Sequence, residues 1–269
     1  MKHTDVKRYW DRNADAWTKL SRAGYDVYRD HLNTPAFLAM LPDIHGLSGL
    51  DIGCGEGSNT RLLAGRGARM TALDISEVFI RHAARPPALE PSSADYLVAS
   101  AVELPFADET FDFATGFMSF MDIPETDCVL AEAQRVLKPG AFLQFSIIHP
   151  CFDNKRNLRD ENGHTYAVEV SDYFQNLHGV VEEWLFSAAP PEAKEGVRNF
   201  KIPRFTRTLS QWLNLLVEKG FRLERLEEPR PSDKVVREFP ALQDAQVAAF
   251  FLLIRARKPA SGESGISAV

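Results

Sequence analysis

The chain has 269 residues, of which 45% are hydrophobic, and a formal net charge of −6 at pH 7. A chain of this size can bury one large core. Overall acidity without a Lys/Arg cluster argues against nucleic acid as a partner, because that binding depends on neutralising phosphates. The three cysteines lack CxxC spacing, which predicts a reducing, cytoplasmic location and no metal site. The longest apolar run, within 248–254, is too short for a membrane span, so no membrane partner is expected.

The first 45 residues carry helical patterns and no strand pattern. Tyr9 and Trp17 are near enough in the helical repeat to share one face of a helix. Two roles are open for these aromatic residues: they pack the helix onto the core, or they close over a bound ligand.

The segment Leu50–Gly57 reads LDIGCGEG, the pattern of a buried strand that runs into a tight glycine turn. Three glycines in this turn leave no side chains above the backbone, so a ligand can lie directly against it. Asp74 ends the next apolar run, MTALD, about 20 residues later. That is where α/β nucleotide-binding folds place the carboxylate that binds a ribose diol. The two features together predict an adenosine-type cofactor.

The spacing of the glycines in the turn distinguishes between the possible cofactors. A dinucleotide fingerprint is GxGxxG, whereas the turn here is GxGxG, which disfavours an NAD(P)-dependent oxidoreductase. Asp51 before the turn and Glu56 within it would repel a pyrophosphate, but they suit a ligand with an ammonium and a sulfonium. No GxxxxGK[ST] segment occurs, so a P-loop has no support.

Short apolar strands alternate with helical stretches from Leu47 onward, which predicts a parallel sheet with right-handed crossovers. We expect strands near 48–53, 69–74, 95–99, 111–117 and 140–147, and helices near 58–66, 76–84 and 125–137. A further helix is expected at 208–220, followed by an antiparallel pair of strands at 221–228 and 248–257. The predicted fold class is therefore α/β: a Rossmann-like, doubly wound, seven-stranded sheet, mostly parallel with an antiparallel last strand, and with helices on both faces.

Residues 149–206 interrupt this rhythm with aromatic, charged and proline residues that show no sustained periodicity. A long insertion after the fifth strand begins at the carboxyl edge of the sheet, where open α/β sheets bind ligands. We therefore expect it to be a substrate cap. The predicted organisation is a helical segment at 1–45, a cofactor-binding core at 46–148, the cap at 149–206, the rest of the core at 207–258 and a disordered tail at 259–269.

Four motifs in this order resemble the class I S-adenosylmethionine (SAM)-dependent methyltransferases, in their small, single-domain, type 11-like subgroup. They are LDIGCGEG, ALDIS with Asp74, ELPFADETFD at 103–112 and EAQRVLKPGAFL at 132–143, and the likeness covers roughly 47–146. The resemblance implies SAM as cofactor and S-adenosylhomocysteine as product. It says almost nothing about the methyl acceptor, because function depends on the site grafted onto a fold.

The resemblance also implies roles for individual residues in cofactor binding. In this family an N-terminal aromatic helix often closes over the methionine end of SAM, which would make 1–45 a lid containing Tyr9 and Trp17. The backbone of the glycine turn would contact the methionine moiety, and Asp51 would orient its ammonium or satisfy nearby backbone amides. Besides Asp51, we expect Gly53, Cys54 and Gly55 to contact the methionine moiety, Asp74 to contact the ribose and Ile75 to contact the adenine.

Two further segments are expected at the cofactor. Family members often have an acidic residue after the third strand, near the adenine amino group, but this chain has Ser100 followed by Ala101 and Val102. Adenine recognition would then depend on the Ser100 hydroxyl or on the neighbouring backbone. Phe117 and Met118 end the fourth strand, where they would approach the reactive methyl group or pack in the core.

Methyl transfer from SAM needs alignment of the reactants above all, and a base only when the acceptor must lose a proton. His149 follows the fifth strand at its carboxyl end, and histidine is a residue type well suited to act as a general base, so it is the first candidate for a catalytic base; otherwise it shapes the strand end. Weaker candidates for the base are Asp122, His178, Glu183 and Arg207. The aromatic residues of the insertion could line an acceptor pocket or support the insertion from below; they are Tyr166, Tyr173, Phe174 and Trp184.

The sequence thus predicts a cytoplasmic SAM-dependent methyltransferase, monomeric or homodimeric, acting on an O, N or C nucleophile of a small molecule. Two alternatives stay open on the same fold: a non-catalytic SAM-binding protein and another SAM-using transferase.

Overall fold

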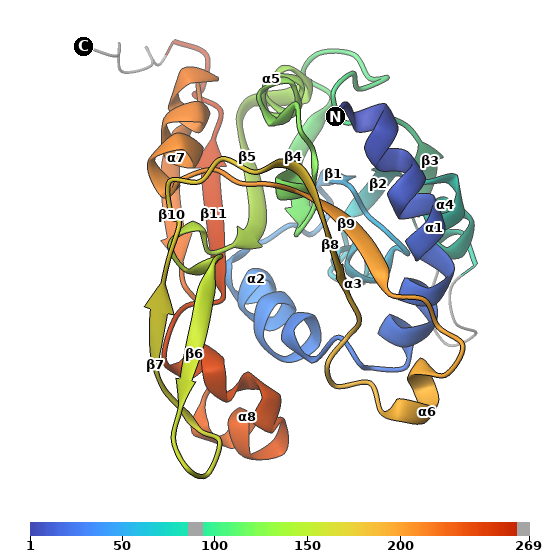
Figure 1. Cartoon of the computed structure of the whole chain (residues 1–269). Helices are drawn as coiled ribbons and strands as arrows, with labels where there is room; N and C mark the ends of the chain where they lie inside the picture. The colour runs from blue at the N-terminus through green and yellow to red at the C-terminus, as the bar shows by residue number, and fades with distance from the viewer. Residues whose placement is uncertain (86–93, 263–269) are drawn as a thin grey trace.

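The computed structural model describes residues 1–85 and 94–262 and is built around one seven-stranded sheet in the order β10-β11-β5-β4-β1-β2-β3 (Figure 1). Strand β1 pairs in parallel with both β2 and β4, so the chain winds outward from the centre of the sheet in both directions. This confirms the doubly wound arrangement. The strands that pair in parallel are β1 (Ser48–Ile52), β2 (Arg69–Asp74), β3 (Ala94–Val98), β4 (Phe111–Phe117) and β5 (Leu137–Ile148).

The other end of the sheet holds the two last strands, β10 (Arg222–Glu227) and β11 (Phe251–Arg257). Strand β11 runs antiparallel to both β5 and β10, which confirms the predicted antiparallel last strand. It begins at Phe251, later than the expected Ala248, because a short helical stretch fills much of the preceding segment. That segment contains α8 (Asp233–Glu238) and the 3-10 helix η4 (Pro240–Gln246), which were not predicted.

Helices cover both faces of the sheet. On one face α5 (Thr126–Val136) and α7 (Leu209–Glu218) bury Val129, Leu130 and Leu216 against the strands in the largest core cluster. On the other face α2 (Thr34–Met40) and α3 (Ser58–Gly65) enclose smaller clusters. Helix α4 (Glu77–Ala83) lies against β2 and β3. Helix α5 ends at Val136, close to the expected end near 137, and β5 begins at Leu137, earlier than the expected 140.

The secondary-structure elements of the N-terminal segment are all helical: α1 (His3–Arg22), the π-helical turn η1 (Arg29–Asn33) and α2. Apolar residues of α1 recur at helical spacing, and Val6, Ala14 and Leu20 among them are buried. Helix α1 lies against α4 and against β9 of the insertion, so it bridges the core and the inserted segment (Figure 1).

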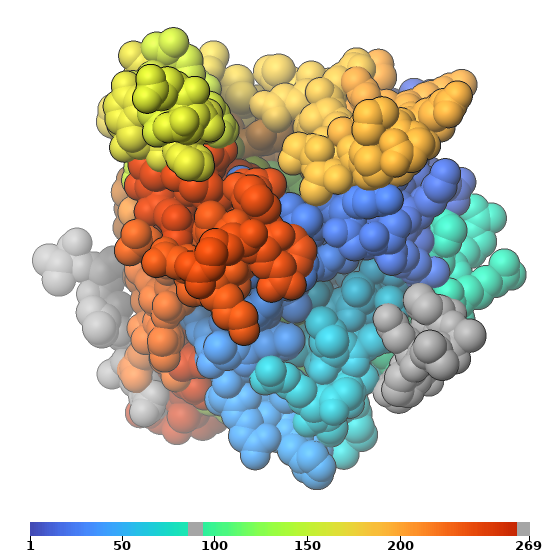
Figure 2. Space-filling model, turned by 90° about the horizontal axis from the view of Figure 1, so that it is seen from below, coloured from blue at the N-terminus to red at the C-terminus, as the bar shows by residue number. Residues whose placement is uncertain are grey.

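The insertion contains two antiparallel hairpins that its aperiodic sequence did not reveal. They are β6–β7 (Lys155–Arg159 and Thr165–Val170) and β8–β9 (His178–Trp184 and Phe200–Phe205), with the short helices η3 (Pro150–Phe152) and α6 (Pro191–Lys194). Figure 2 shows the β6–β7 hairpin and the segment around α6 at separate corners of one face, with part of the N-terminal segment beside the α6 corner. Many side chains of these strands are partly exposed, so alternation of apolar and polar residues is weak.

The predicted disordered tail falls mostly at 263–269, outside the described residues. Within the described ranges, no helix combines the length and apolar character needed to cross a membrane. The same ranges hold no group of three or more His, Cys, Asp or Glu residues arranged to bind a metal ion.

Candidate cofactor and acceptor site

A cavity of about 590 Å³ lies where the carboxyl ends of the central strands meet the N-terminal helices and the insertion. This volume is within the range of roughly 300–1,000 Å³ that is common for ligand pockets. Its walls come from the glycine turn, the ends of β2 and β4, helix α1, η1 and both inserted hairpins. The cavity therefore lies where open α/β sheets bind their ligands.

The glycine turn has the backbone geometry that its sequence predicts. Gly53, Gly55 and Gly57 have φ values of +74°, +56° and +82°, which favour glycine. A Cβ atom on Gly53 would lie 2.5 Å from the Cβ of Ser119, so the loop after β4 rests directly on the turn. At Gly55, which lines the cavity, an added Cβ would meet no heavy atom within 4 Å. The backbone of Gly55 is therefore open to a ligand.

Asp74 lies beside this turn, although the two are far apart in the chain. Its Oδ2 accepts a hydrogen bond of 2.9 Å from the backbone N–H of Gly55, and its Oδ1 accepts one of 2.8 Å from Ser76. The side chain lines the cavity, and burial raises its pKa to about 6. Each oxygen keeps a further lone pair, so the carboxylate can still accept hydrogen bonds from a diol.

The two other acids of this region are engaged within the protein. Asp51 is buried and accepts hydrogen bonds of 2.5 Å from Thr60 and 2.9 Å from Thr115. Burial raises the pKa of Asp51 to about 6. Glu56 is also buried, but it pairs with arginines, so the expected repulsion of a pyrophosphate by a free Glu56 carboxylate is wrong.

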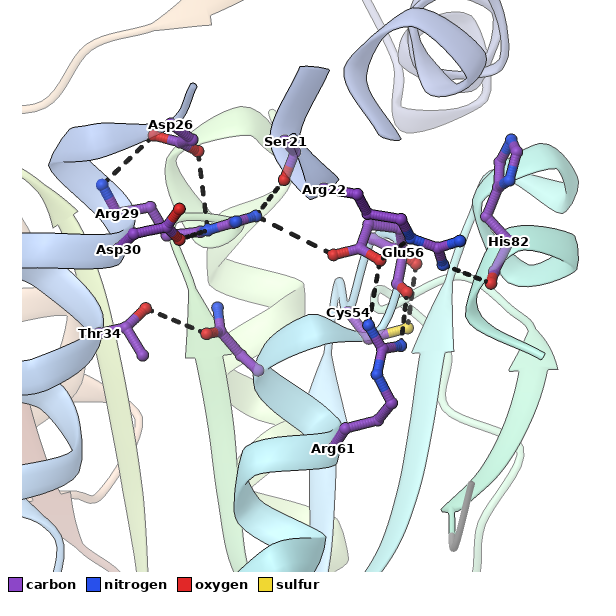
Figure 3. Close-up of polar contacts among 12 residues, drawn as sticks. Ser21, Arg22, Asp26, Arg29, Asp30, Thr34, Cys54, Glu56, Arg61 and His82 are labelled. Carbon is purple, nitrogen blue, oxygen red and sulfur yellow. Dashed lines mark hydrogen bonds and ion pairs between the residues drawn. The ribbon is translucent and has the colours of Figure 1, made fainter. Parts of the chain in front are cut away.

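Figure 3 shows how this arginine cluster joins the N-terminal segment to the glycine turn. Glu56 Oε2 accepts from Arg22 of α1 at 2.9 Å and from Arg61 of α3 at 3.2 Å. Arg29 of η1 lies 4.0 Å from the other Glu56 oxygen and bonds Asp30 and Ser21. Because a single buried carboxylate contacts three elements, Glu56 fixes the helices that cover the cavity.

Most of the residues predicted to bind cofactor are brought together in the cavity wall. Besides the turn, these are Asp51, Cys54, Ile75, Ser100, Ala101, Phe117, Met118 and Trp17. Two residues are not. Val102 packs against the core cluster, and its N–H donates to Ser100 Oγ. Tyr9 is not part of the cavity wall. Its neighbour Trp10 lines the cavity instead, and the Trp10 ring centroid lies 5.6 Å from that of Trp17.

His149 does not line the cavity, contrary to the expectation for a base. Its side chain is buried, its Nε2 lies 2.7 Å from Glu228 Oε1, and its Nδ1 accepts from the N–H of Cys151 at 3.2 Å. Both ring nitrogens are thus engaged where the chain leaves β5. These contacts favour the other role considered for His149, which is to shape the strand end.

A different acid faces the cavity on this side. Asp122 follows β4 in the loop that rests on the glycine turn, and its side chain lines the cavity and is buried. Burial raises its pKa to about 7; Arg204 opposes this shift, while Asp153 and Glu182 add to it. Among the described residues no side chain or backbone group hydrogen-bonds its carboxylate.

The other acceptor-side candidates divide between the cavity and the rest of the surface. Trp184 lines the cavity, together with Phe186 and Ile202 of the insertion. His178 and Arg207 line a second cavity of about 440 Å³, and Glu183 pairs with Lys201 at 2.8 Å. Tyr166 and Phe174 are exposed, and the Tyr173 hydroxyl accepts from the N–H of Leu209, so these three do not form the expected aromatic pocket.

Several residues of the wall were not predicted as site residues: Trp10, Asn33, Phe79, Ser119, Asp153, Lys155, Arg204 and Phe250. Trp10 could have been found from its spacing of seven residues to Trp17, about two helical turns. Phe79 lies in α4 and Asn33 in η1, and the others come from loops and hairpins with no periodic signal.

Comparison with known proteins identifies the class. A methyltransferase domain family model matches residues 50–145. An O-methyltransferase of Penicillium expansum is 29% identical over 65% of this chain and 70% of its own length. The 27-O-demethylrifamycin SV methyltransferase of Amycolatopsis mediterranei is 27% identical over 84% of this chain and 82% of its own. A SAM-dependent methyltransferase structure from Mesorhizobium loti is 26% identical, with a TM-score of 0.65, and covers 83% of this chain and 96% of its own.

These similarities support a class I SAM-dependent methyltransferase with SAM as its cofactor. The residues present fit SAM: the open backbone at Gly55 lies next to the free lone pairs of Asp74, and Trp10, Trp17 and Met118 enclose the same space.

Proposed function

We propose that this protein transfers the methyl group of SAM to a hydroxyl oxygen of an apolar small molecule, with Asp122 as the general base. The observation that carries the proposal is Asp122: a buried carboxyl group without a hydrogen-bond partner among the described residues, in the wall of the cavity, with a pKa raised to about 7. A base is most effective when its pKa lies near the working pH.

On the cofactor side, the chain provides binding and orientation. SAM supplies an electrophilic methyl group on a sulfonium. Asp74 would hold the ribose diol, and the backbone of Gly53–Gly55 would receive the methionine moiety. Ile75, Ser100 and Ala101 would surround the adenine, and Phe117 and Met118 would lie near the reacting centre. Alignment of this kind contributes about 7–11 kcal/mol to such reactions.

On the acceptor side, the chain provides an apolar enclosure and a proton acceptor. We assign residues 1–45 as a lid and 149–206 as a substrate cap, because helix α1, η1 and both inserted hairpins contribute side chains to the wall. The Asp122 carboxylate would take the proton of the acceptor hydroxyl as its oxygen attacks the methyl carbon. The aromatic wall of Trp184, Phe186 and Phe152 would exclude water from this step.

The relatives support oxygen as the methylated atom, since one of those described above is named an O-methyltransferase and another a 27-O-demethylrifamycin SV methyltransferase. A base such as the Asp122 carboxylate favours a hydroxyl acceptor, because the hydroxyl must lose its proton, whereas a neutral amine attacks without losing one first. A non-catalytic SAM-binding role would leave a buried, unpaired Asp122 without a purpose, at a cost in stability.

The test is a measurement of S-adenosylhomocysteine release with a set of bicyclic phenols and their methyl ethers. We expect release with at least one phenol and none with the corresponding ether, and loss of release in Asp122→Asn with unchanged SAM binding by calorimetric titration. Methyl transfer that Asp122→Asn leaves intact would remove Asp122 from the reaction. SAM binding without transfer to any phenol or amine would favour the non-catalytic alternative.

A further inference from the structure

Lys155 opens strand β6 of the insertion and reaches the wall of the cavity. Its Nζ atom is buried and has no hydrogen-bond partner among the described residues. An aromatic face lies close to it: Nζ is 5.2 Å from the centroid of the Phe250 ring, whose own centroid is 4.4 Å from that of the Tyr28 ring. A cation–π contact of this kind compensates only part of the loss of water around an ammonium group.

The acids nearest to Lys155 are occupied by other donors. Asp244 accepts hydrogen bonds from Asn157 at 2.6 Å, from Arg159 at 2.8 Å and from Thr165 at 2.6 Å. Asp153 bonds Arg204. Both acids act on Lys155 only through longer-range attraction, and burial still lowers the pKa of the Lys155 ammonium. The Lys155 ammonium therefore has no direct hydrogen-bonding or ion-pair partner among the described residues.

The position of Lys155 relates it to the proposed base. Asp153 exerts an electrostatic effect on both Lys155 and Asp122, and all three residues line the same cavity. The cofactor end of the cavity, with Gly55 and Asp74, belongs to other elements. Lys155 thus belongs to the part of the cavity that is left for the acceptor.

We propose that Lys155 is an anchor for a carboxylate or similar anionic oxygen group of the methyl acceptor. The inference rests on the proposed function and narrows its substrate class. The acceptor is an apolar, aromatic hydroxy acid, whose ring system lies among Tyr28, Phe250 and Trp184, whose acid group pairs with Lys155 and whose hydroxyl faces Asp122. The anion completes the coordination of a buried ammonium, and the aromatic wall excludes competing water.

The test is direct binding to protein saturated with S-adenosylhomocysteine. The probes are 3-hydroxy-2-naphthoate, 6-hydroxy-2-naphthoate and 4′-hydroxybiphenyl-4-carboxylate, each compared with its carboxamide, which keeps the shape and removes the charge. Fluorescence of Trp10, Trp17 and Trp184, which line the cavity, reports binding. We expect at least one acid to bind about tenfold or more tightly than its amide, as a charge-assisted hydrogen bond allows. Lys155→Met should abolish this preference.

The matched control is Arg156→Met. Arg156 is the next residue in β6, but it is exposed and pairs with Glu169 across the hairpin, so its loss should leave the preference intact. Equal binding of acids and amides to the unmodified protein, no binding of any acid below about 1 mM, or a preference that survives Lys155→Met would each overturn the proposal. Affinity for SAM should be the same in Lys155→Met; a loss of tenfold or more would assign Lys155 to the methionine carboxylate instead.

The outcome is separable from that of the proposed function. Acid binding that depends on Lys155 without release of S-adenosylhomocysteine would contradict methyl transfer and keep the anion site. Methyl transfer that depends on Asp122, with the acids and their amides bound equally tightly, would keep the function and remove the anion site.

Discussion

The two halves of the cavity differ in how their ionisable groups are satisfied. On the cofactor side, Asp51 is bonded by two threonines, Asp74 by two backbone amides and Glu56 by two arginines. On the acceptor side, Asp122 and the Lys155 ammonium lack hydrogen-bond partners among the described residues. The first half is an assembled receptor for a ligand of fixed chemistry. The second half contains a carboxyl group and an ammonium group without hydrogen-bond partners in the described part of the chain, and a specific acceptor would provide the missing contacts.

The largest effect should come from the acceptor half. Asp122→Asn should lower kcat/KM for a hydroxyl acceptor by about 10²–10⁴-fold, because the carboxylate no longer takes the proton. In the unmodified enzyme kcat/KM should rise with pH, about tenfold per unit below pH 7, and level off above it, since the base must be ionised and the pKa of Asp122 is about 7. The variant should lack this inflection. An unchanged pH profile in the variant would assign the ionisation to the acceptor itself.

In the cofactor half, the largest structural effect should follow removal of Glu56. Glu56→Ala removes the buried carboxylate that pairs with Arg22 of α1 and Arg61 of α3, and so it breaks this link between α1 and the glycine turn. Breaking a buried ion pair costs roughly 3–5 kcal/mol, which corresponds to a fall in Tm on the order of 10 °C. Thermal unfolding measures this, with the exposed Glu77→Ala as control. A fall no larger than in the control would show that the arginine cluster does not hold the lid.

Asp74 tests the predicted ribose contact of the cofactor half. Asp74→Ala should raise the SAM dissociation constant about tenfold or more, because a charge-assisted hydrogen bond contributes about 1.5–3 kcal/mol. Calorimetric titration with SAM measures the change, and Asp122→Asn provides a comparison from the other half, with little expected effect on SAM affinity. Unchanged affinity in Asp74→Ala would place the ribose elsewhere.

The same division marks what the sequence could predict. The glycine turn and Asp74 lie at the ends of regular strands, so strand periodicity and motif spacing are enough to predict that they lie together. The acceptor half comes from loops and twisted hairpins, in which Lys155, Arg204 and Phe250 meet through tertiary contacts between segments without a periodic pattern. His149 was predicted as a base from its position after β5. The direction of its ring, toward Glu228, depends on contacts that position in the sequence does not determine.

A stability measurement separates the two halves by pH. The pKa of Asp122 is raised in the folded protein from 3.8 to about 7, so its contribution to stability is fully present below pH 3.8 and is lost as the pH rises through 7. Asp122→Asn avoids this loss. Without acceptor, the variant should therefore be more stable than the unmodified protein at pH 8, by about 1–3 kcal/mol, and the difference should shrink toward pH 5.5. Chemical denaturation across this range measures it, with the exposed Glu161→Gln as control. A difference independent of pH would mean that Asp122 is ionised without cost.

The smallest effect is expected at His149, which lies outside both halves. His149→Asn should keep an acceptor for the Cys151 N–H and lose the contact with Glu228, which is largely exposed, so the free energy of unfolding should fall by about 1 kcal/mol. SAM affinity and the pH dependence of kcat/KM should be unchanged, because the imidazole does not line the cavity. Steady-state kinetics from pH 6 to 9 measure this. A loss of the ionisation near pH 7 in His149→Asn, together with its persistence in Asp122→Asn, would transfer the role of base from the loop after β4 to the end of β5.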